Sequence, residues 1–294
     1  MVVPAQAVRI GYKTAVIEYL RLVRLRIVAM VLFAMAVAAY ATAETAPPWQ
    51  AVVHSLLGTA LVIAGAMAIN QRLERRGDAS MARTASRPLP AGRLRAAEVT
   101  RFGLLLTAFG LVCLMLLGNG TVTALAALSW ALYVAIYTPL KSRSVWQTPV
   151  GAAAGAMPVL LGAATAGGLF TPTAAALFGI VFFWQYPHSM AIGWLYRDQF
   201  ARAEVKLATV LDPTGRTAGV LAVLGAVALV PVSLAPLWEG TAGWPYAATA
   251  AVLGAGYLAF SAAILRLPNE KTARRLLRAS LVYLTLIFVA LLMM

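Results

Sequence analysis

Charged side chains are scarce in this sequence. Asp, Glu, Lys and Arg make up 12% of the 294 residues, whereas hydrophobic residues make up 61%. This balance excludes an ordinary water-soluble domain and places the chain in a lipid bilayer. Acidic residues are the scarcest: only ten accompany 24 Lys and Arg, which gives a formal charge of +14. In a membrane chain such basic residues face anionic headgroups and phosphates, so we expect no nucleic-acid partner.

Thiols and nucleophilic constellations are also missing. Cys113 is the only cysteine and lies inside an apolar run, which excludes an intramolecular disulfide and a zinc or redox motif built on thiols. No nucleophile–base arrangement of a hydrolase is evident. Basic residues precede a full-length hydrophobic stretch near the N-terminus, and there is no short apolar segment with a cleavage site, so we expect no cleaved signal peptide.

Hydrophobic segments dominate what is present. A spanning helix needs about 20 apolar residues, and nine segments approach that length: 27–43, 51–71, 102–118, 121–139, 146–167, 171–194, 217–237, 244–265 and 279–294. We therefore predict an all-α integral membrane protein of about nine transmembrane helices, forming a single domain over 1–294.

The basic residues decide the orientation. With a cytoplasmic N-terminus, all 24 fall before the first span or after spans two, four, six and eight, while the opposite loops carry only Glu44 and Glu239. The positive-inside rule favours this topology. Because 72–101 and 195–216 are the long charged loops, we expect a multi-pass protein of the inner (cytoplasmic) membrane with its active site on the cytoplasmic side.

The first chemical motif lies where the second span leaves the membrane. Asn70, Glu74 and Asp78 recur every four residues, so in a helix they share one face. Two carboxylates and an amide form a hard-oxygen site suited to Mg²⁺. Arg83 and Arg87 follow, and guanidinium groups match phosphate oxygens.

A plainer interpretation of this motif is a solvated helix end. Glu74 would then pair with neighbouring arginines, and Arg83 and Arg87 would anchor to headgroups. Against this, Asn70 and Glu74 begin at the edge of an apolar span, where polar groups are costly and tend to be functional.

Further charged groups fall in two other loops on the predicted cytoplasmic side: Lys141, Arg143, Arg197, Asp198, Arg202, Glu204, Lys206 and Asp212. An allylic diphosphate needs this inventory, because negative charge builds on the leaving diphosphate and Mg²⁺ with cationic side chains stabilises it. The apolar tail of such a substrate fits between helices.

One pattern is specific enough to name a family. The residues Asn-x-x-x-Glu-x-x-x-Asp-x-x-Met-x-Arg-Thr-x-x-Arg-Pro-Leu, at 70–89, resemble the first motif of the intramembrane UbiA prenyltransferase superfamily, and in particular its heme O synthase branch. Three further stretches agree: YTPLKSR at 137–143, GAAAGAMPVLLG at 151–162 and WQYPHSMAIGWLYRD at 184–198. The resemblance runs from the first span to the ninth. It implies a UbiA-type bundle.

The resemblance also implies an activity and its ligands. A farnesyl group would pass from farnesyl diphosphate to a vinyl group of heme B, with water addition, giving heme O. Mg²⁺ would be the cofactor and heme B a substrate. Membrane lipid and a heme A synthase or oxidase assembly partner are the other expected partners.

Roles carry over position by position. The resemblance implies that the loops 72–101 and 195–216 form a diphosphate-binding cap. The catalytic residues would be Asn70, Glu74, Asp78 and Asp198, of which the two Asp and Glu74 bind metal. The diphosphate would be held by Arg83, Arg87, Lys141, Arg143, Arg197 and Arg202. His188 would contact heme; the alternative is that it hydrogen-bonds a carbonyl freed by Pro187 in a kinked helix.

The second cluster departs from the family pattern. Gln199 and Phe200 stand where the family commonly has an acid and Tyr, and Glu204 stands where it has Gly. The departure leaves the metal count and the acceptor open. The alternatives are a UbiA-type prenyltransferase with an aromatic or quinone-precursor acceptor, a transporter, and a non-catalytic heme-handling membrane protein.

Overall fold

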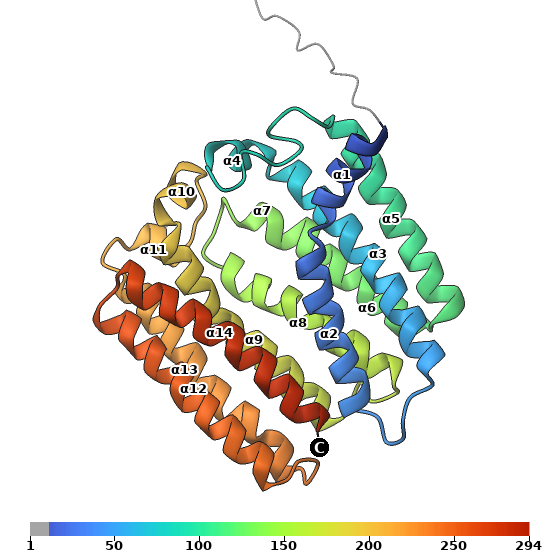
Figure 1. Ribbon diagram of the computed structural model, residues 1–294, viewed down its shortest axis with the longest axis vertical. Helices are drawn as coiled ribbons and strands as arrows, with labels where there is room; N and C mark the ends of the chain where they lie inside the picture. The colour runs from blue at the N-terminus through green and yellow to red at the C-terminus, as the bar shows by residue number, and fades with distance from the viewer. Residues whose placement is uncertain (1–11, 294) are drawn as a thin grey trace, which may run out of the picture.

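A computed structural model describes residues 12–293 of the chain as helices joined by loops, and this part contains no strand (Figure 1). The predicted all-α class is confirmed. Long helices lie over eight of the nine predicted spans: α2 (Leu25–Ala41), α3 (Trp49–Leu73), α5 (Ala96–Leu117), α8 (Gln147–Thr165), α9 (Pro172–Leu195), α12 (Arg216–Trp238), α13 (Trp244–Arg266) and α14 (Glu270–Leu292). The predicted span 121–139 is covered by α6 (Gly120–Ala131), which begins a helical stretch of 21 residues that ends at Leu140. Shorter elements are α1 (Tyr12–Val23), α4 (Arg75–Ser80), the π-helix η1 (Leu132–Tyr137), α7 (Thr138–Leu140), α10 (Arg197–Arg202) and α11 (Ala208–Leu211).

Apolar length alone identifies fewer spans than the sequence pattern does. Seven helices of the described chain are long and apolar enough to cross a membrane, or eight if the bent pair formed by α1 and α2 counts as one span. The predicted number of about nine is therefore approximate. The remaining long helix, α9, carries Gln185, Tyr186 and His188 near its middle, and these side chains lower its hydropathy.

Small residues bring two of the helices very close together. A Cβ added to Gly65 of α3 would lie 2.5 Å from the backbone oxygen of Gly103 on α5, and one added to Gly110 would lie 2.8 Å from the oxygen of Gly58. Small side chains allow such close approach between membrane helices. The contact fixes α3, which carries the first chemical motif out of the bundle.

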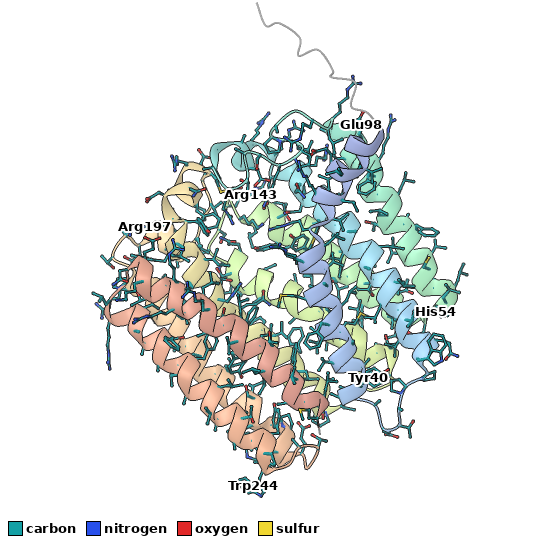
Figure 2. All side chains as sticks on the ribbon, viewed as in Figure 1. Tyr40, His54, Glu98, Arg143, Arg197 and Trp244 are labelled. Atoms are coloured by element: carbon teal, nitrogen blue, oxygen red, sulfur yellow. The ribbon has the colours of Figure 1, made fainter. Side chains whose placement is uncertain are left out.

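The short elements gather at one end of the bundle. Figure 1 shows α4, α7, α10 and α11 together at this end, and Figure 2 shows Arg143, Arg197 and Glu98 toward it, with Trp244 and Tyr40 toward the other. A hydrogen bond from the Arg83 backbone N–H to Gln199 Oε1, 3.3 Å long, joins the two long loops. The loops predicted to hold the chemistry therefore meet, whereas their cytoplasmic placement stays a prediction.

Two irregularities in the helices point at the same region. The pair α1 and α2 bends by 44° at Arg24, whose φ of 53° lies in the left-handed region that is uncommon for residues other than glycine. The π-helix η1 interrupts the helix between α6 and α7. Such π segments occur frequently at functional sites, and both irregularities deliver side chains to the cavity described next.

Candidate active site

A cavity of about 650 Å³ lies between α9 and the α3–α4 segment, which carries Asn70, Glu74 and Asp78. Its lining residues come from α3, α4, η1, α7, α8, α9 and α10, from the bend at Arg24, and from the loops after α4, α7 and α10. The polar lining is concentrated in groups that bind phosphate or metal: Arg24, Asn70, Glu74, Asp78, Arg83, Arg87, Lys141 and Arg143. Seven of these eight are predicted site residues, so the structure brings most of the predicted site together.

Asn70 has its amide group oriented by the neighbouring helix. The side chain is 2% exposed, and its Nδ2 donates to Thr138 Oγ1 at 3.0 Å. Thr138 in turn donates to the carbonyl of Tyr133 at 2.7 Å, across the π-helix. Because the amide nitrogen is engaged, the amide oxygen is the group that Asn70 presents to the cavity.

Glu74 meets a lysine from a distant part of the chain. Lys141 Nζ lies 2.5 Å from Glu74 Oε1 and 4.4 Å from the ring centroid of Tyr137. Burial lowers the pKa of Lys141, but Tyr137 and Glu74 raise it more, so the net pKa lies above the usual lysine value. The lysine therefore stays charged within the site.

Asp78 is the most deeply buried carboxylate of the motif. It is 1% exposed, and its Oδ2 accepts from Arg87 NH1 at 2.6 Å. Burial raises the pKa of Asp78, and Arg87 opposes this effect only in part, so the net pKa lies above its usual value. A buried carboxylate with a raised pKa is poised to gain from a further cation.

Arg83 is held at the cavity by aromatic rings. Its guanidinium carbon lies 5.1 Å from the ring centroid of Tyr196 and 4.8 Å from that of Phe200. Burial, followed by repulsion from Arg87 and Arg24, lowers the pKa of Arg83. Arg24, Arg83 and Arg87 repel one another, and a bound anion such as a diphosphate would relieve this repulsion.

The three charged site residues predicted for the second cluster, Arg197, Asp198 and Arg202, do not line this cavity, although Phe200 does. The Asp198 side chain is 86% exposed, and its nearest cation is Arg197 at 3.6 Å. Arg197 lies over the ring of Trp194 at 4.5 Å, and Arg202 donates from Nε to the backbone oxygen of Asp198 at 3.3 Å. In this conformation α10 turns all three toward the surface, so their roles stay predictions.

His188 lies apart from the lining residues as well. Its Nδ1 is 2.8 Å from Ser280 Oγ on α14, and its ring stacks on Trp184 with centroids 4.5 Å apart. Trp184 Nε1 donates to the Ser280 carbonyl at 2.7 Å. The partner of the histidine is thus a hydroxyl group on another helix and not a carbonyl freed by Pro187, and contact with heme stays a prediction.

The lining residues that the sequence reasoning missed include Arg24, Gln147 and Gln185. Arg24 belongs to a basic N-terminal segment whose charges look topological, and nothing in the pattern sets it apart. Gln147 and Gln185 did carry a signal, because a carboxamide within an apolar span is costly and therefore noteworthy.

The oxygen groups of the first motif fit a hard divalent cation. Over residues 12–293 no group of three or more His, Cys, Asp or Glu is placed to hold a metal, so the carboxylates here are two, Glu74 and Asp78. Their ion pairs use Oε1 and Oδ2, which leaves the other oxygen of each, together with the Asn70 amide oxygen. Mg²⁺ is usually held by one or two carboxylates together with substrate phosphates, and this donor set suits that arrangement.

Comparisons with known proteins identify the family. The UbiA prenyltransferase family matches residues 30–291. Curated relatives called protoheme IX farnesyltransferase include that of Solibacter usitatus, 42% identical over 238 residues, with 80% of each chain covered. That of Opitutus terrae is 35% identical over 277 residues, with 93% of each chain covered.

Solved structures share the fold. A structure of digeranylgeranylglyceryl phosphate synthase superposes with a TM-score of 0.80 at 16% identity, covering 95% of this chain and 97% of that one. A UbiA homolog from Archaeoglobus fulgidus bound to GPP and Mg²⁺ gives a TM-score of 0.62 at 17% identity, covering 93% and 99%. At these identities the likeness establishes the fold alone.

Proposed function

The chain belongs to the UbiA prenyltransferase family, and we propose that it transfers a farnesyl group from farnesyl diphosphate to a vinyl group of heme B, with addition of water, to give heme O. One observation carries the transferase assignment: Glu74, Asp78 and the Asn70 amide oxygen share a cavity with four guanidinium groups and a lysine. The names of the relatives support the choice of farnesyl and protoheme IX.

The proposed role of each lining residue follows from its contacts. Asn70, Glu74 and Asp78 hold Mg²⁺, and the cations that line the same cavity hold the diphosphate: Arg24, Arg83, Arg87, Lys141 and Arg143. The loops 72–101 and 195–216 form the cap over this region of the single domain 1–294. Asp198, Arg197 and Arg202 join the site only if α10 turns inward, because all three face the surface here.

Catalysis rests on stabilising the leaving group. As the C1–O bond of the allylic diphosphate breaks, negative charge builds on the diphosphate, and preorganised cations lower the barrier electrostatically. Lys141 and Arg87 are already fixed, by Glu74 and Asp78, so little reorganisation is needed. Bound Mg²⁺ supplies further charge neutralisation at the diphosphate.

The acceptor attacks without a protein nucleophile. The vinyl group of heme supplies its electron pair to the allylic carbon, so the protein must hold the acceptor near C1 and keep the isoprenoid in an apolar environment. The lining also includes the apolar side chains of Ala152, Ile192 and Leu207, which suit the tail. We propose His188, near Ser280 on α14, as a contact for heme.

The place of the reaction follows from the charge distribution. We propose that the site faces the cytoplasm in a multi-pass protein of the inner membrane, because the basic loops gather at the end where the cavity lies. A heme A synthase or an oxidase assembly factor is the partner class that would receive the product. The surrounding membrane lipid holds both apolar substrates.

Three other functions are competing hypotheses. One of them, a non-catalytic heme-handling membrane protein, would bind heme but form no farnesylated product. Another UbiA-type prenyltransferase would use the same cations with an aromatic or quinone-precursor acceptor. A transporter would place its polar site near the bilayer midplane, whereas the charged groups of this cavity lie at the end formed by α4 and α10. The cavity therefore favours a transferase, and the acceptor decides between the two transferases.

Mass spectrometry of extracted heme tests the proposal. Purified protein is incubated with heme B, farnesyl diphosphate and Mg²⁺, with a no-metal control and parallel reactions containing a 4-hydroxybenzoate acceptor. We expect a hydroxyethylfarnesyl heme only when metal is present. Prenylation of the aromatic acid, with heme unchanged, would support the alternative transferase.

A further inference from the structure

Gln185 presents an unpaired carbonyl oxygen to the cavity. Its Nε2 donates to the backbone oxygen of Ala152 at 3.0 Å and to that of Val181 at 3.4 Å. Backbone oxygens only accept, so these contacts determine which end of the carboxamide is nitrogen. The Oε1 atom receives no hydrogen bond from residues 12–293, and Gln185 lines the cavity.

The neighbouring helix is built to hold this carboxamide in place. A Cβ added to Gly155 of α8 would lie 2.6 Å from both Nε2 and Oε1 of Gln185. Any other residue at Gly155 would thus displace the amide. Gly155 and the backbone oxygen of Ala152, both on α8, hold the Gln185 carboxamide in the middle of α9. An acceptor without a partner is costly within such an apolar span.

The position of Gln185 excludes a diphosphate as its ligand. The lining residues Ser189 and Ile192 follow it on α9 toward α10, so Gln185 lies deeper than they do. The cations Arg83 and Arg87 belong to the loop beyond α4 at the mouth. A carbonyl oxygen accepts hydrogen bonds and repels phosphate oxygens. The proposed metal donors Asn70, Glu74 and Asp78 come from the α3–α4 segment, so the partner that we assign to Gln185 Oε1 is an O–H or N–H donor and not the metal.

The proposed reaction needs one such donor. When the terminal vinyl carbon bonds to farnesyl C1 and the C1–O bond breaks, the diphosphate leaves and a cation remains on the carbon attached to the porphyrin. Water can add to that carbon, forming a C–O bond and releasing a proton, for which the departed diphosphate is a base. Without a placed water, the cation loses a proton from a neighbouring carbon, and the product is an alkene.

We propose that Gln185 Oε1 binds and orients the water that captures this cation. The inference rests on the proposed heme farnesylation and goes beyond it by assigning the hydration step to a residue. Gln185 acts as a hydrogen-bond acceptor and not as the base. It is therefore expected to govern which product forms more than how fast the farnesyl group is transferred.

The product ratio tests this assignment. Gln185→Met removes the acceptor at similar volume, and extracted heme is analysed for the hydroxylated adduct and for the adduct lighter by one water. We expect the ratio of hydroxylated to dehydrated product to fall about tenfold, as for loss of one oriented hydrogen bond, while total farnesylated heme changes by only a few-fold.

A matched control separates this role from helix packing. Gln71 also donates from Nε2 to a backbone oxygen on another helix, that of Leu22 at 2.8 Å, but it does not line the cavity. Gln71→Met should lower thermal stability and leave the product ratio unchanged. If Gln185→Met fails to accumulate in membranes, Gly155→Ala displaces the same amide and should lower the ratio.

The outcomes are distinguishable from failure of the proposed function. If the wild-type protein forms no farnesylated heme, the proposed function is wrong and the inference falls with it. If the wild-type protein forms heme O and the displaced or substituted variants keep the wild-type ratio, the hydration role of Gln185 is overturned while the proposed function stands.

Discussion

Lys141 Nζ lies 2.5 Å from Glu74 Oε1 and joins two segments that are 67 residues apart in the chain. The lysine follows the π-helix and α7, and the glutamate ends α3. The pair therefore ties the first chemical motif to the loop that carries Arg143. Removing either partner leaves a partly buried charge without its counterion.

The first prediction concerns this pair. Glu74→Gln and Lys141→Met should each reduce kcat/KM for farnesyl diphosphate, and the double variant should lose less than the sum of the two losses. Residues in direct contact are coupled by roughly 0.5–3 kcal/mol, so we expect a coupling of about 1 kcal/mol. A double-mutant cycle on kcat/KM measures this coupling free energy, and strict additivity would show that Glu74 and Lys141 act independently in turnover.

The second prediction concerns Asp78. Asp78→Asn keeps the size of the side chain but removes a charge that the proposed metal requires, and we expect kcat to fall by about a hundredfold or more. The variant also loses the ion pair with Arg87, so its unfolding midpoint should fall, and turnover is compared at a temperature at which both proteins are folded. Glu270→Gln is the control, because Glu270 pairs with Arg274 at the surface and should keep wild-type turnover. Full activity in Asp78→Asn would remove Asp78 from the site.

The third prediction contrasts Asp198 with Asp78. The Asp198 side chain is 86% exposed, and surface substitutions usually change free energies by less than about 0.5 kcal/mol. Asp198→Asn should therefore alter kcat by less than about threefold. A loss as large as that of Asp78→Asn would instead show that α10 turns inward during turnover, as the family pattern implies.

The fourth prediction follows from the raised pKa of Asp78. Mg²⁺ binds the ionised carboxylate, so at a pH below the raised pKa its binding must release a proton. Affinity for Mg²⁺ should therefore rise with pH through a window above the ordinary Asp value of about 3.9. Calorimetric titration in buffers of different ionisation enthalpy would detect the released proton. Asp78→Asn should lack this proton release, and an equal release from both proteins would assign it elsewhere.

The fifth prediction uses a departure from the family pattern. Glu204 has a φ of 57°, and a left-handed conformation costs a residue with a Cβ about 1–2 kcal/mol. Glycine avoids this cost but loses roughly 0.5–1 kcal/mol of chain entropy on folding. Glu204→Gly should therefore stabilise the protein by up to about 1 kcal/mol, measured as a higher unfolding midpoint. Destabilisation would show that the glutamate makes a compensating contact.

The sequence predicted the helices better than the positions of Arg197, Asp198 and Arg202. Apolar runs locate spans because a helix satisfies its own backbone hydrogen bonds in lipid, and a helical stretch of at least 17 residues lies over each of the nine predicted segments. Asn70, Glu74 and Asp78 all line the cavity, although α3 ends just before Glu74 and α4 begins just after it. Their regular spacing made that predictable.

Other features depend on contacts that no local pattern encodes. The outward turn of Asp198 depends on the short helix α10, and the pairing of His188 with Ser280 depends on how α14 packs against α9. Arg24 lines the cavity at the bend between α1 and α2, where its own backbone is in the left-handed conformation. These placements arise from tertiary packing, so spacing in the sequence could not predict them.

The position of the metal tests the account most directly. Crystals grown with Mn²⁺ and a non-cleavable thio analogue of farnesyl diphosphate would locate the cation by anomalous scattering. We predict a peak bounded by the side-chain oxygens of Asn70, Glu74 and Asp78, with the diphosphate analogue between it and Arg83. A peak held by the α10 loop alone, with those three side chains still paired as they are here, would contradict the account.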